Sequence, residues 1–296
     1  MIKPENPTAA TSRAWTILSL IEWSADHLSS RGFEDCRLNA ELLLAHVLQL
    51  SRVQLYTQYD RPLSFAELTS YRDLFRRRLT HEPLQYILGE TEFMGLPLFV
   101  NSTVLIPRPE TEQLVERSLE ALRRIGNETP AVLDIGTGSG NIAIALGIQF
   151  PNAKVTAVDI SAAALETAAR NVERHQIKNI TLLQADVFTD FLPDETFDLI
   201  VSNPPYIAAA EFGTLQPEVR DFEPRIATTD GGDGFRFIRR ISELAMKKLN
   251  PGGWLLMEIA YNQFEHSRAI ATQAGLSGVE VLSDLSGVPR IVRGQK

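Results

Sequence analysis

From about residue 111 to the end of the chain, short apolar runs alternate with segments of helical period. The runs typical of β-strands cover residues 131–135, 154–159, 180–184, 197–202 and 254–259. Parallel strands need long crossover connections, and helices usually supply them. The alternation therefore predicts a doubly wound, mostly parallel sheet with helices on both faces. Two further runs, 279–282 and 290–292, predict a hairpin at the edge of that sheet.

The first 80 or so residues follow a different pattern. Their apolar residues recur at helical spacing, and Ser64 followed by Glu67 is a capping box that opens a segment ending at Pro83. Short apolar runs around Gly89 and Gly95 then favour a hairpin. We therefore expect an all-helical bundle over residues 1–84, a β-hairpin linker over 85–105 and an α/β domain over 106–296.

Composition and charge disfavour several classes of binding partner and functional site. The 296 residues include 29 Lys and Arg against 37 Asp and Glu, a net charge of −8, which is the wrong sign for a protein that binds by neutralising phosphates. Cys36 is the only cysteine and the five histidines lack ligand spacing, so neither a disulfide nor a metal centre is expected. No apolar run could span a membrane, and residues 1–11 do not read as a signal peptide, which favours a cytosolic location.

A glycine-rich loop follows the first strand of the α/β region. It reads Asp134-Ile135-Gly136-Thr137-Gly138-Ser139-Gly140. Glycines let the backbone turn sharply beside a ligand, and ligands of such sheets bind at the carboxyl ends of the strands. Asn141 stands where the dinucleotide fingerprint requires its last glycine, so the loop disfavours NAD.

Two more acids end the next two strands. Asp159 lies where it could accept hydrogen bonds from both ribose hydroxyls of a nucleoside, and Asp186 is suited to an adenine amino group. With Asp134 and the glycine loop, this set resembles the S-adenosylmethionine site of Rossmann-like methyltransferases. The alternative for each acid alone is that it caps the following helix.

The fourth strand ends in Asn203-Pro204-Pro205-Tyr206. Two prolines fix two φ angles and remove two donors, so the Asn203 side chain and the Pro204 carbonyl are held as acceptors. This pair suits a planar NH₂ group, with the Tyr206 ring packed on the flat substrate. Such a nitrogen is a poor nucleophile, so positioning is the main catalytic lever we expect. An ordinary proline turn is the alternative.

This motif occurs in enzymes that methylate adenine amino groups in DNA and in those that methylate glutamine amides. The whole chain, over about residues 15–293, resembles the release factor glutamine methyltransferase family. The resemblance rests on Asp134 to Gly140, Asn203 to Tyr206 and four further segments: Pro83 to Gly89, Ile106 to Glu112, Phe222 to Pro224 and Asp230 to Gly234.

The resemblance implies an S-adenosylmethionine-dependent enzyme that methylates the glutamine side chain in the Gly-Gly-Gln loop of peptide chain release factors, and so acts on translation termination. The implied catalytic residues are Asn203, Pro204, Pro205 and Tyr206. The implied cofactor residues are Asp134, Gly136, Thr137, Gly138, Ser139, Gly140, Asp159, Asp186, Val187 and Asn203. Val187 is smaller than the side chain many relatives carry there, which weakens the adenine contact.

The resemblance leaves other roles open. The helical bundle would bind the release factor away from its reactive loop. Arg108 and Glu110 would lie near the cofactor or the substrate loop, or else form a salt bridge that fixes the linker; the 222–234 segments receive no chemical role. A DNA adenine methyltransferase is the alternative function, disfavoured because the acidic chain predicts no DNA binding. A binding module without chemistry is disfavoured because Asn203 is present.

Overall fold

A computed structural model describes residues 14–189, 195–284 and 286–296. The chain forms two compact units, Met1–Leu88 and Gly89–Lys296. The segment 1–11, in which no signal peptide was expected, lies outside the described residues. No helix among the described residues is both long and apolar enough to cross a membrane.

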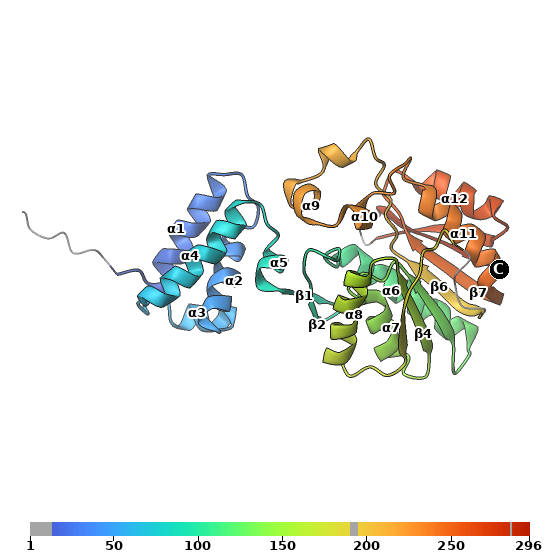
Figure 1. Ribbon diagram of the computed structural model, residues 1–296, viewed down its shortest axis with the longest axis horizontal. Helices are drawn as coiled ribbons and strands as arrows, with labels where there is room; N and C mark the ends of the chain where they lie inside the picture. Colours follow the sequence, from blue (N-terminus) through green and yellow to red (C-terminus); the bar gives the residue numbers. More distant parts are fainter. Residues whose placement is uncertain (1–13, 190–194, 285) are drawn as a thin grey trace, which may run out of the picture. The chain divides into compact units, whose positions relative to one another are not determined.

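The described part of the first unit is a bundle of five helices: α1 (Ile17–Ser29), α2 (Cys36–Leu48), α3 (Arg52–Thr57), α4 (Phe65–Leu79) and α5 (Leu84–Leu88) (Figure 1). The capping box predicted at Ser64 and Glu67 opens α4. Leu28, Leu43, Leu44 and Phe75 are among the residues that fill its apolar core. Arg78, near the end of α4, is buried and donates to Asn39 Oδ1 at 2.6 Å.

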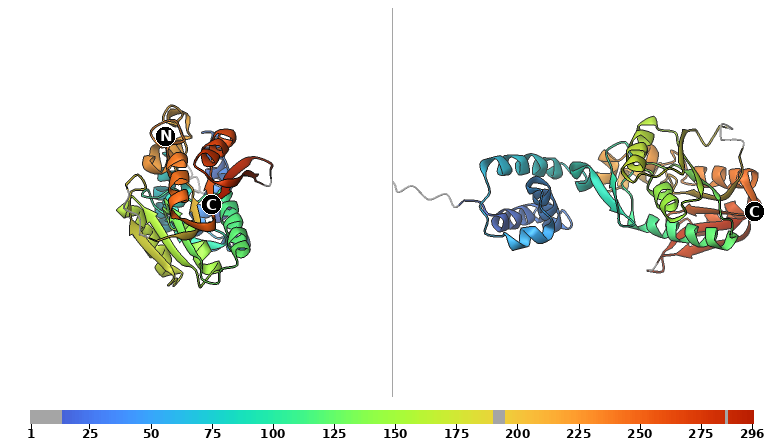
Figure 2. Two further views of the ribbon diagram at one scale, coloured as in Figure 1. Left: turned by 90° about the vertical axis from the view of Figure 1, so that its right-hand side faces the viewer. Right: turned by 90° about the horizontal axis from the view of Figure 1, so that it is seen from below.

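The second unit contains a seven-stranded sheet in the order β5-β4-β3-β6-β7-β9-β8. Its strands are β3 (Ala131–Ile135), β4 (Lys154–Asp159), β5 (Ile180–Gln184), β6 (Phe197–Ser202), β7 (Leu249–Glu258), β8 (Ser277–Ser283) and β9 (Pro289–Gln295). The first five of these are parallel neighbours, whereas β9 pairs antiparallel with both β7 and β8. The doubly wound sheet and its antiparallel edge hairpin, which Figure 2 shows in two further views, confirm the predicted fold class.

Helices cover both faces of this sheet (Figures 1 and 2). One apolar layer joins the sheet to α6 (Pro109–Ile125) and α7 (Asn141–Gln149), and α8 (Ala162–Arg174) packs on the same face. The other layer joins it to α11 (Arg236–Lys248) and α12 (Phe264–Gln273). Alternate strand residues face opposite sides, so Val132 enters the first layer and Leu133 the second.

The expected hairpin is the antiparallel pair β1 (Glu90–Phe93) and β2 (Leu96–Phe99), which packs against α8 within the second unit. Asn171 of α8 accepts from the Phe99 N–H at 2.7 Å. Its side-chain NH₂ donates to the carbonyls of Phe99 and Ser139 at 3.0 and 2.9 Å. One buried amide therefore joins the hairpin to the glycine loop.

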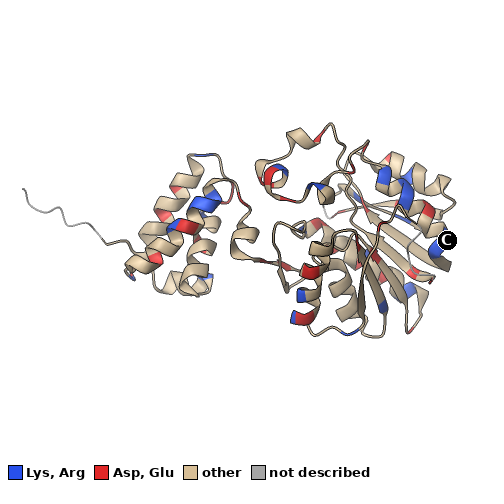
Figure 3. Ribbon diagram, viewed as in Figure 1, with Lys and Arg blue, Asp and Glu red and all other residues tan. Residues whose placement is uncertain are grey.

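Between β6 and α11 the chain forms only short elements: η1 (Phe212–Thr214), α9 (Pro217–Phe222) and α10 (Arg225–Thr228). This long connection passes over the carboxyl ends of the central strands, and residues from α10 line the cavity found there. Positions of Lys and Arg (blue) and of Asp and Glu (red) intermingle along the ribbon of the second unit in Figure 3. Two ion pairs there are Arg239–Asp233 and Arg293–Glu280.

Candidate active site

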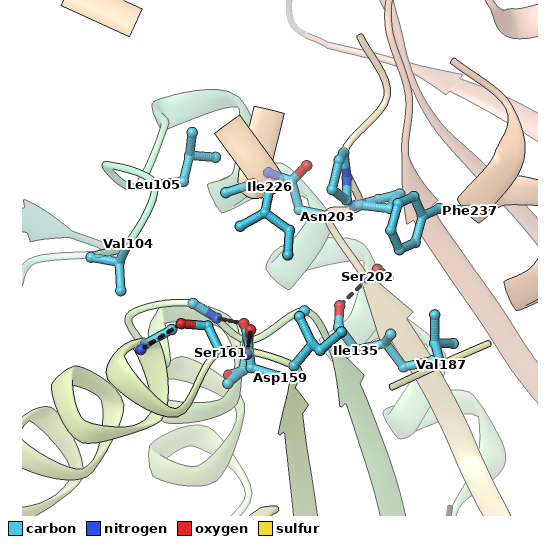
Figure 4. Close-up of a pocket in the computed structure, with 18 of the residues that line it drawn as sticks. Val104, Leu105, Ile135, Asp159, Ser161, Val187, Ser202, Asn203, Ile226 and Phe237 are labelled. Atoms are coloured by element: carbon cyan, nitrogen blue, oxygen red, sulfur yellow. Dashed lines mark hydrogen bonds between the residues drawn. The ribbon is translucent and has the colours of Figure 1, made fainter. Parts of the chain in front are cut away.

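A cavity of about 520 Å³ opens at the carboxyl ends of β3, β4 and β6. Figure 4 shows Asn203 and Ile226 on one side of it, facing Asp159 and Ile135 on the other. Ten of the residues proposed from the sequence line it: Gly136, Thr137, Gly138, Ser139, Asp159, Asp186, Val187, Asn203, Pro204 and Pro205. Asp134, Gly140 and Tyr206 do not, and each has another place in the structure.

The glycine loop is fixed to the neighbouring strand by its backbone. The N–H groups of Gly136 and Thr137 both donate to the Val158 carbonyl, at 2.8 and 3.0 Å. Gly136 and Gly138 have φ values of 74° and 54°, which side chains with a Cβ rarely adopt, and the space beside both is open. Gly140 serves packing instead, because a Cβ there would lie 3.3 Å from that of Ala168.

Asp134 lies below this loop and is fully buried. It accepts a hydrogen bond from the Thr137 hydroxyl at 2.7 Å, while its Oδ1 has no hydrogen-bond partner among the described residues. Burial raises the pKa of the Asp134 carboxyl to about 7, against the lowering effect of the Thr137 hydrogen bond. The contact that the structure shows for this carboxyl is therefore with the glycine loop, through the Thr137 side chain.

Asp159, at the end of β4, presents its carboxylate to the cavity. One oxygen accepts from the Gly138 N–H and the other from the Ser161 N–H, both at 2.9 Å (Figure 4). Burial raises the pKa of this carboxyl, and these backbone donors partly offset the effect. A carboxylate offers about four acceptor sites, so two remain for hydroxyl groups of a ligand.

Two aromatic residues, Phe188 after β5 and Phe237 of α11, line the cavity beside Val187. The sequence did not indicate either of them. The rings of Phe188 and Phe237 meet edge to face with centroids 5.0 Å apart, and the Arg236 guanidinium lies over Phe188 at 4.2 Å. Asp186 accepts from the Phe188 N–H at 2.9 Å. These rings supply the flat apolar wall that the small Val187 side chain does not.

Asn203 follows β6, whose last residue is tied to β3 by a hydrogen bond from the Ser202 hydroxyl to the Ile135 carbonyl at 2.7 Å. The Asn203 NH₂ group donates to the Thr111 hydroxyl at 3.0 Å. Among the described residues, none donates to Asn203 Oδ1 or to the Pro204 carbonyl. Both oxygens therefore remain available to accept hydrogen bonds at the cavity wall.

The sequence predicts that the Tyr206 ring packs on the flat substrate. Tyr206 does not line the cavity, and its hydroxyl donates to Glu258 Oε1 at 3.3 Å. Burial and the nearby Glu258 charge raise the pKa of Tyr206 above its usual range. In this structure the Tyr206 side chain thus fixes the Asn-Pro-Pro-Tyr segment to Glu258.

Two residues behind Asn203 were missed from the sequence. Thr111 of α6 donates its hydroxyl to Glu258 Oε2 at 2.7 Å, and both side chains are buried. Burial raises the pKa of Glu258 to about 7, although the Thr111 and Tyr206 hydrogen bonds lower it. A signal existed, because Glu258 ends the last parallel strand as Asp159 ends the second.

Gln263 was also missed. Its side-chain NH₂ donates to the Tyr206 carbonyl at 2.8 Å and to the Gly234 carbonyl at 3.3 Å. Gly234 must be glycine, because a Cβ there would lie 2.7 Å from the Tyr206 carbonyl oxygen. The Asp230 to Gly234 segment therefore holds the far end of the Asn-Pro-Pro-Tyr turn, a structural role that the sequence did not indicate.

Arg108 and Glu223 form an ion pair at 2.7 Å that joins the segment before α6 to the long connection after β6. Arg108 thus forms a salt bridge, one of the two alternatives left open for it, and it also lines the cavity, as the other alternative implied. The Glu110 side chain is more exposed than that of Arg108, and its Oε1 lies 3.9 Å from Arg290 Nη2.

The cavity suits S-adenosylmethionine. Asp159 offers free acceptor sites for ribose hydroxyls, the aromatic wall offers a flat surface for adenine, and the glycine loop leaves open space. Ser139 lines the cavity, and its buried hydroxyl has no partner among the described residues. A polar ligand would satisfy it. No group of acidic, histidine or cysteine side chains suited to a metal ion occurs in the described part of the chain.

The chain is similar in sequence to known methyltransferases. Residues 19–89 match the family model of the PrmC N-terminal domain, and residues 113–216 match that of the methyltransferase small domain. The release factor glutamine methyltransferase of Geobacter sulfurreducens is 46% identical over 281 residues, which cover 95% of this chain and 97% of that protein. The enzyme of the same name from Rhodopirellula baltica is 41% identical, covering 95% and 97%.

Among solved structures, the hMettl16 catalytic domain in complex with the MAT2A 3′UTR hairpin has a TM-score of 0.58 and 19% identity. The match covers 79% of this chain and 93% of that one. At this identity the likeness concerns the fold alone.

Proposed function

The chain belongs to the release factor glutamine methyltransferase family, and we propose that it transfers a methyl group from S-adenosylmethionine to the side-chain amide nitrogen of the glutamine in the Gly-Gly-Gln motif of peptide chain release factors. The observation that carries this proposal is the free pair of acceptors, Asn203 Oδ1 and the Pro204 carbonyl, at the wall of the cavity that suits the cofactor. We further propose that the enzyme acts in the cytoplasm on the translation termination machinery.

The residues act by binding and orientation. Asn203 Oδ1 and the Pro204 carbonyl accept the two N–H groups of the substrate amide. Their pull raises electron density on nitrogen and favours a pyramidal geometry with the lone pair directed into the cavity. When bound, S-adenosylmethionine supplies an electrophilic methyl group on a positively charged sulfur. Holding reactants in line can contribute roughly 7 to 11 kcal/mol. The N–CH₃ bond would form as the methyl–sulfur bond breaks, and one N–H proton of the substrate amide would leave to solvent by way of the oxygen that accepts it.

The same two acceptors support selectivity for an amide. A glutamate side chain in place of glutamine would bring a charged acceptor against two acceptors. Sites built on such hydrogen bonds discriminate by about 10⁴ to 10⁵. The glycine loop, Asp159 and Ser139 are the groups we assign to the cofactor, with the Phe188 and Phe237 rings beside its adenine.

The N-terminal helical bundle is, in this proposal, the part that binds the release factor away from its reactive loop. The two family models match different parts of the chain, the bundle and the catalytic domain, which supports a division of labour between them.

The test is incubation of the protein with labelled S-adenosylmethionine and either a release factor or double-stranded DNA, followed by mass spectrometry of the Gly-Gly-Gln peptide. We expect one added methyl group on the glutamine and no label in DNA. Label in adenine of DNA, with none in the peptide, would establish the alternative adenine methyltransferase.

A further inference from the structure

Behind the acceptor asparagine, three side chains form a line that leads away from the cavity. Asn203 donates to the Thr111 hydroxyl at 3.0 Å, and Thr111 donates to Glu258 at 2.7 Å. Thr111 and Glu258 are 1% and 3% exposed, so water does not compete for these bonds. The three residues come from the turn after β6, the first turn of α6 and the end of β7.

The order of donors in this line fixes which way the asparagine amide faces. At pH 8, above its pKa of about 7, Glu258 is mainly a carboxylate, which can only accept, and a threonine hydroxyl has a single proton. The proton of Thr111 is used on Glu258, so the side of Thr111 Oγ1 that faces Asn203 can only accept. Asn203 must therefore turn its NH₂ group toward Thr111, which leaves Oδ1 as the atom offered to the cavity.

The opposite rotation of this amide would be unproductive. It would present the Asn203 NH₂ group to the NH₂ group of the substrate, so that two donors would face each other. It would also place Asn203 Oδ1 against Thr111 Oγ1, two oxygens without a proton between them. Without this support the two rotations differ little, because the oxygen and the NH₂ group of an amide have similar shapes.

We propose that Thr111 and Glu258 are positioning residues, which set the rotation of the Asn203 side chain so that its oxygen, and not its NH₂ group, receives the substrate amide. The inference rests on the proposed function for its catalytic consequence only, since the orientation itself is a property of the free protein. Glu258 fixes a second part of the turn as well, through the Tyr206 hydroxyl.

The decisive variants are Thr111→Val, which keeps the shape and removes the hydroxyl, and Thr111→Ser, which keeps the hydroxyl. Ser118→Ala is the matched control, because Ser118 is a buried residue on the same helix whose hydroxyl, among the described residues, bonds only to the Leu114 carbonyl. At pH 8 and saturating cofactor, we expect Thr111→Val to lower kcat on the release factor about 10- to 100-fold, as loss of a supporting hydrogen-bond partner does elsewhere. KM for the release factor and the Kd of S-adenosylhomocysteine should change less than about twofold, and Thr111→Ser and Ser118→Ala should remain close to wild type.

The orientation can be measured without turnover. In ¹H–¹⁵N spectra the side-chain amide signal of Asn203, identified by its absence in Asn203→Ala, should shift in Thr111→Val and stay in place in Thr111→Ser and Ser118→Ala. If the wild type methylates no release factor but these shifts occur, the proposed function fails and the positioning holds. Wild-type kcat in Thr111→Val, or equal loss in Thr111→Ser and Thr111→Val, would overturn the positioning role, as would an unmoved Asn203 signal.

Discussion

The Arg108 guanidinium and the Glu223 carboxylate are 115 residues apart in the chain and bind each other through one Nη2, at 2.7 and 2.8 Å. The Glu223 side chain is 1% exposed and that of Arg108 33% exposed. Burial raises the pKa of Glu223, and the charge of Arg108 lowers it in part. The pair therefore fixes the connection over the cavity by satisfying a carboxylate that water cannot reach.

Arg108→Ala should destabilise the protein by about 1 to 3 kcal/mol, because it leaves the Glu223 carboxylate buried without its donor. The partial exposure of Arg108 keeps the expected loss below that of a fully buried pair. Denaturant unfolding of Arg108→Ala, Glu223→Ala and the double variant measures the coupling. The double variant should lose less than the sum of the two; strict additivity would show that the pair contributes nothing.

Asn203→Ala should lower kcat by about 10² to 10³, the loss seen when one positioned hydrogen-bonding group is removed from an active site. Cofactor binding should remain, because Asp159 and the glycine loop are untouched. Methyl transfer to the release factor and calorimetry with S-adenosylhomocysteine measure the two effects. Equal turnover in the variant would mean that the amide is held elsewhere.

Asp159→Ala should weaken S-adenosylhomocysteine about 10- to 150-fold, which corresponds to a charged hydrogen bond of about 1.5 to 3 kcal/mol. Asp159 also accepts from the Gly138 and Ser161 N–H groups, so part of this loss would come from a looser loop. Asp159→Asn keeps one oxygen and should fall between the two proteins. Calorimetry that gives the wild-type affinity for Asp159→Ala would exclude the assigned role.

Gly234→Ala should reduce both stability and kcat. Its φ is +85°, and the added Cβ would lie 2.7 Å from the Tyr206 carbonyl and from Gln263 Nε2, which pushes against the Asn-Pro-Pro-Tyr turn. Gly126→Ala is the control, because Gly126 has a φ of +69° with no atom within 4 Å of the added Cβ. The free energy of unfolding of the control should fall by only about 1 to 2 kcal/mol, because of backbone strain, and its kcat should stay at the wild-type value. Equal kcat in the two variants would contradict the contact.

The buried carboxyl of Asp134 should make the protein less stable as pH rises. Its pKa of about 7 in the folded state lies above the usual value of 3.8, so between these values the folded state binds the proton more tightly than the unfolded state. Stability therefore falls as pH increases from about 4 to 7. Asp134→Asn should be more stable than wild type at pH 8 by about 1 to 3 kcal/mol, with no gain near pH 4. Unfolding curves at both pH values decide this, and a gain independent of pH would point to another cause.

Local patterns determined much of this protein. The five strand runs 131–135, 154–159, 180–184, 197–202 and 254–259 appear as β3, β4, β5, β6 and β7, and only the last begins earlier than expected, at Leu249. A strand's alternation and a helix's caps depend on neighbours in the chain, so they can be read from one sequence. The glycine loop, Asp159 and Asn203 were identified for the same reason, since each directly follows a strand whose end faces the ligand.

What supports those residues was decided only by tertiary structure. Thr111 and Glu258 are 147 residues apart, and nothing local in either segment states that they meet. Likewise Gln263 reaches the Tyr206 carbonyl because of how the strands pair. Gln263 lies between β7 and α12, Tyr206 lies in the turn after β6, and β6 and β7 are neighbours in the sheet. Hydrogen-bond partners of buried groups are chosen by the packing of whole elements. The sequence thus indicated which atoms perform the chemistry, and the folded chain determined which atoms hold them in place.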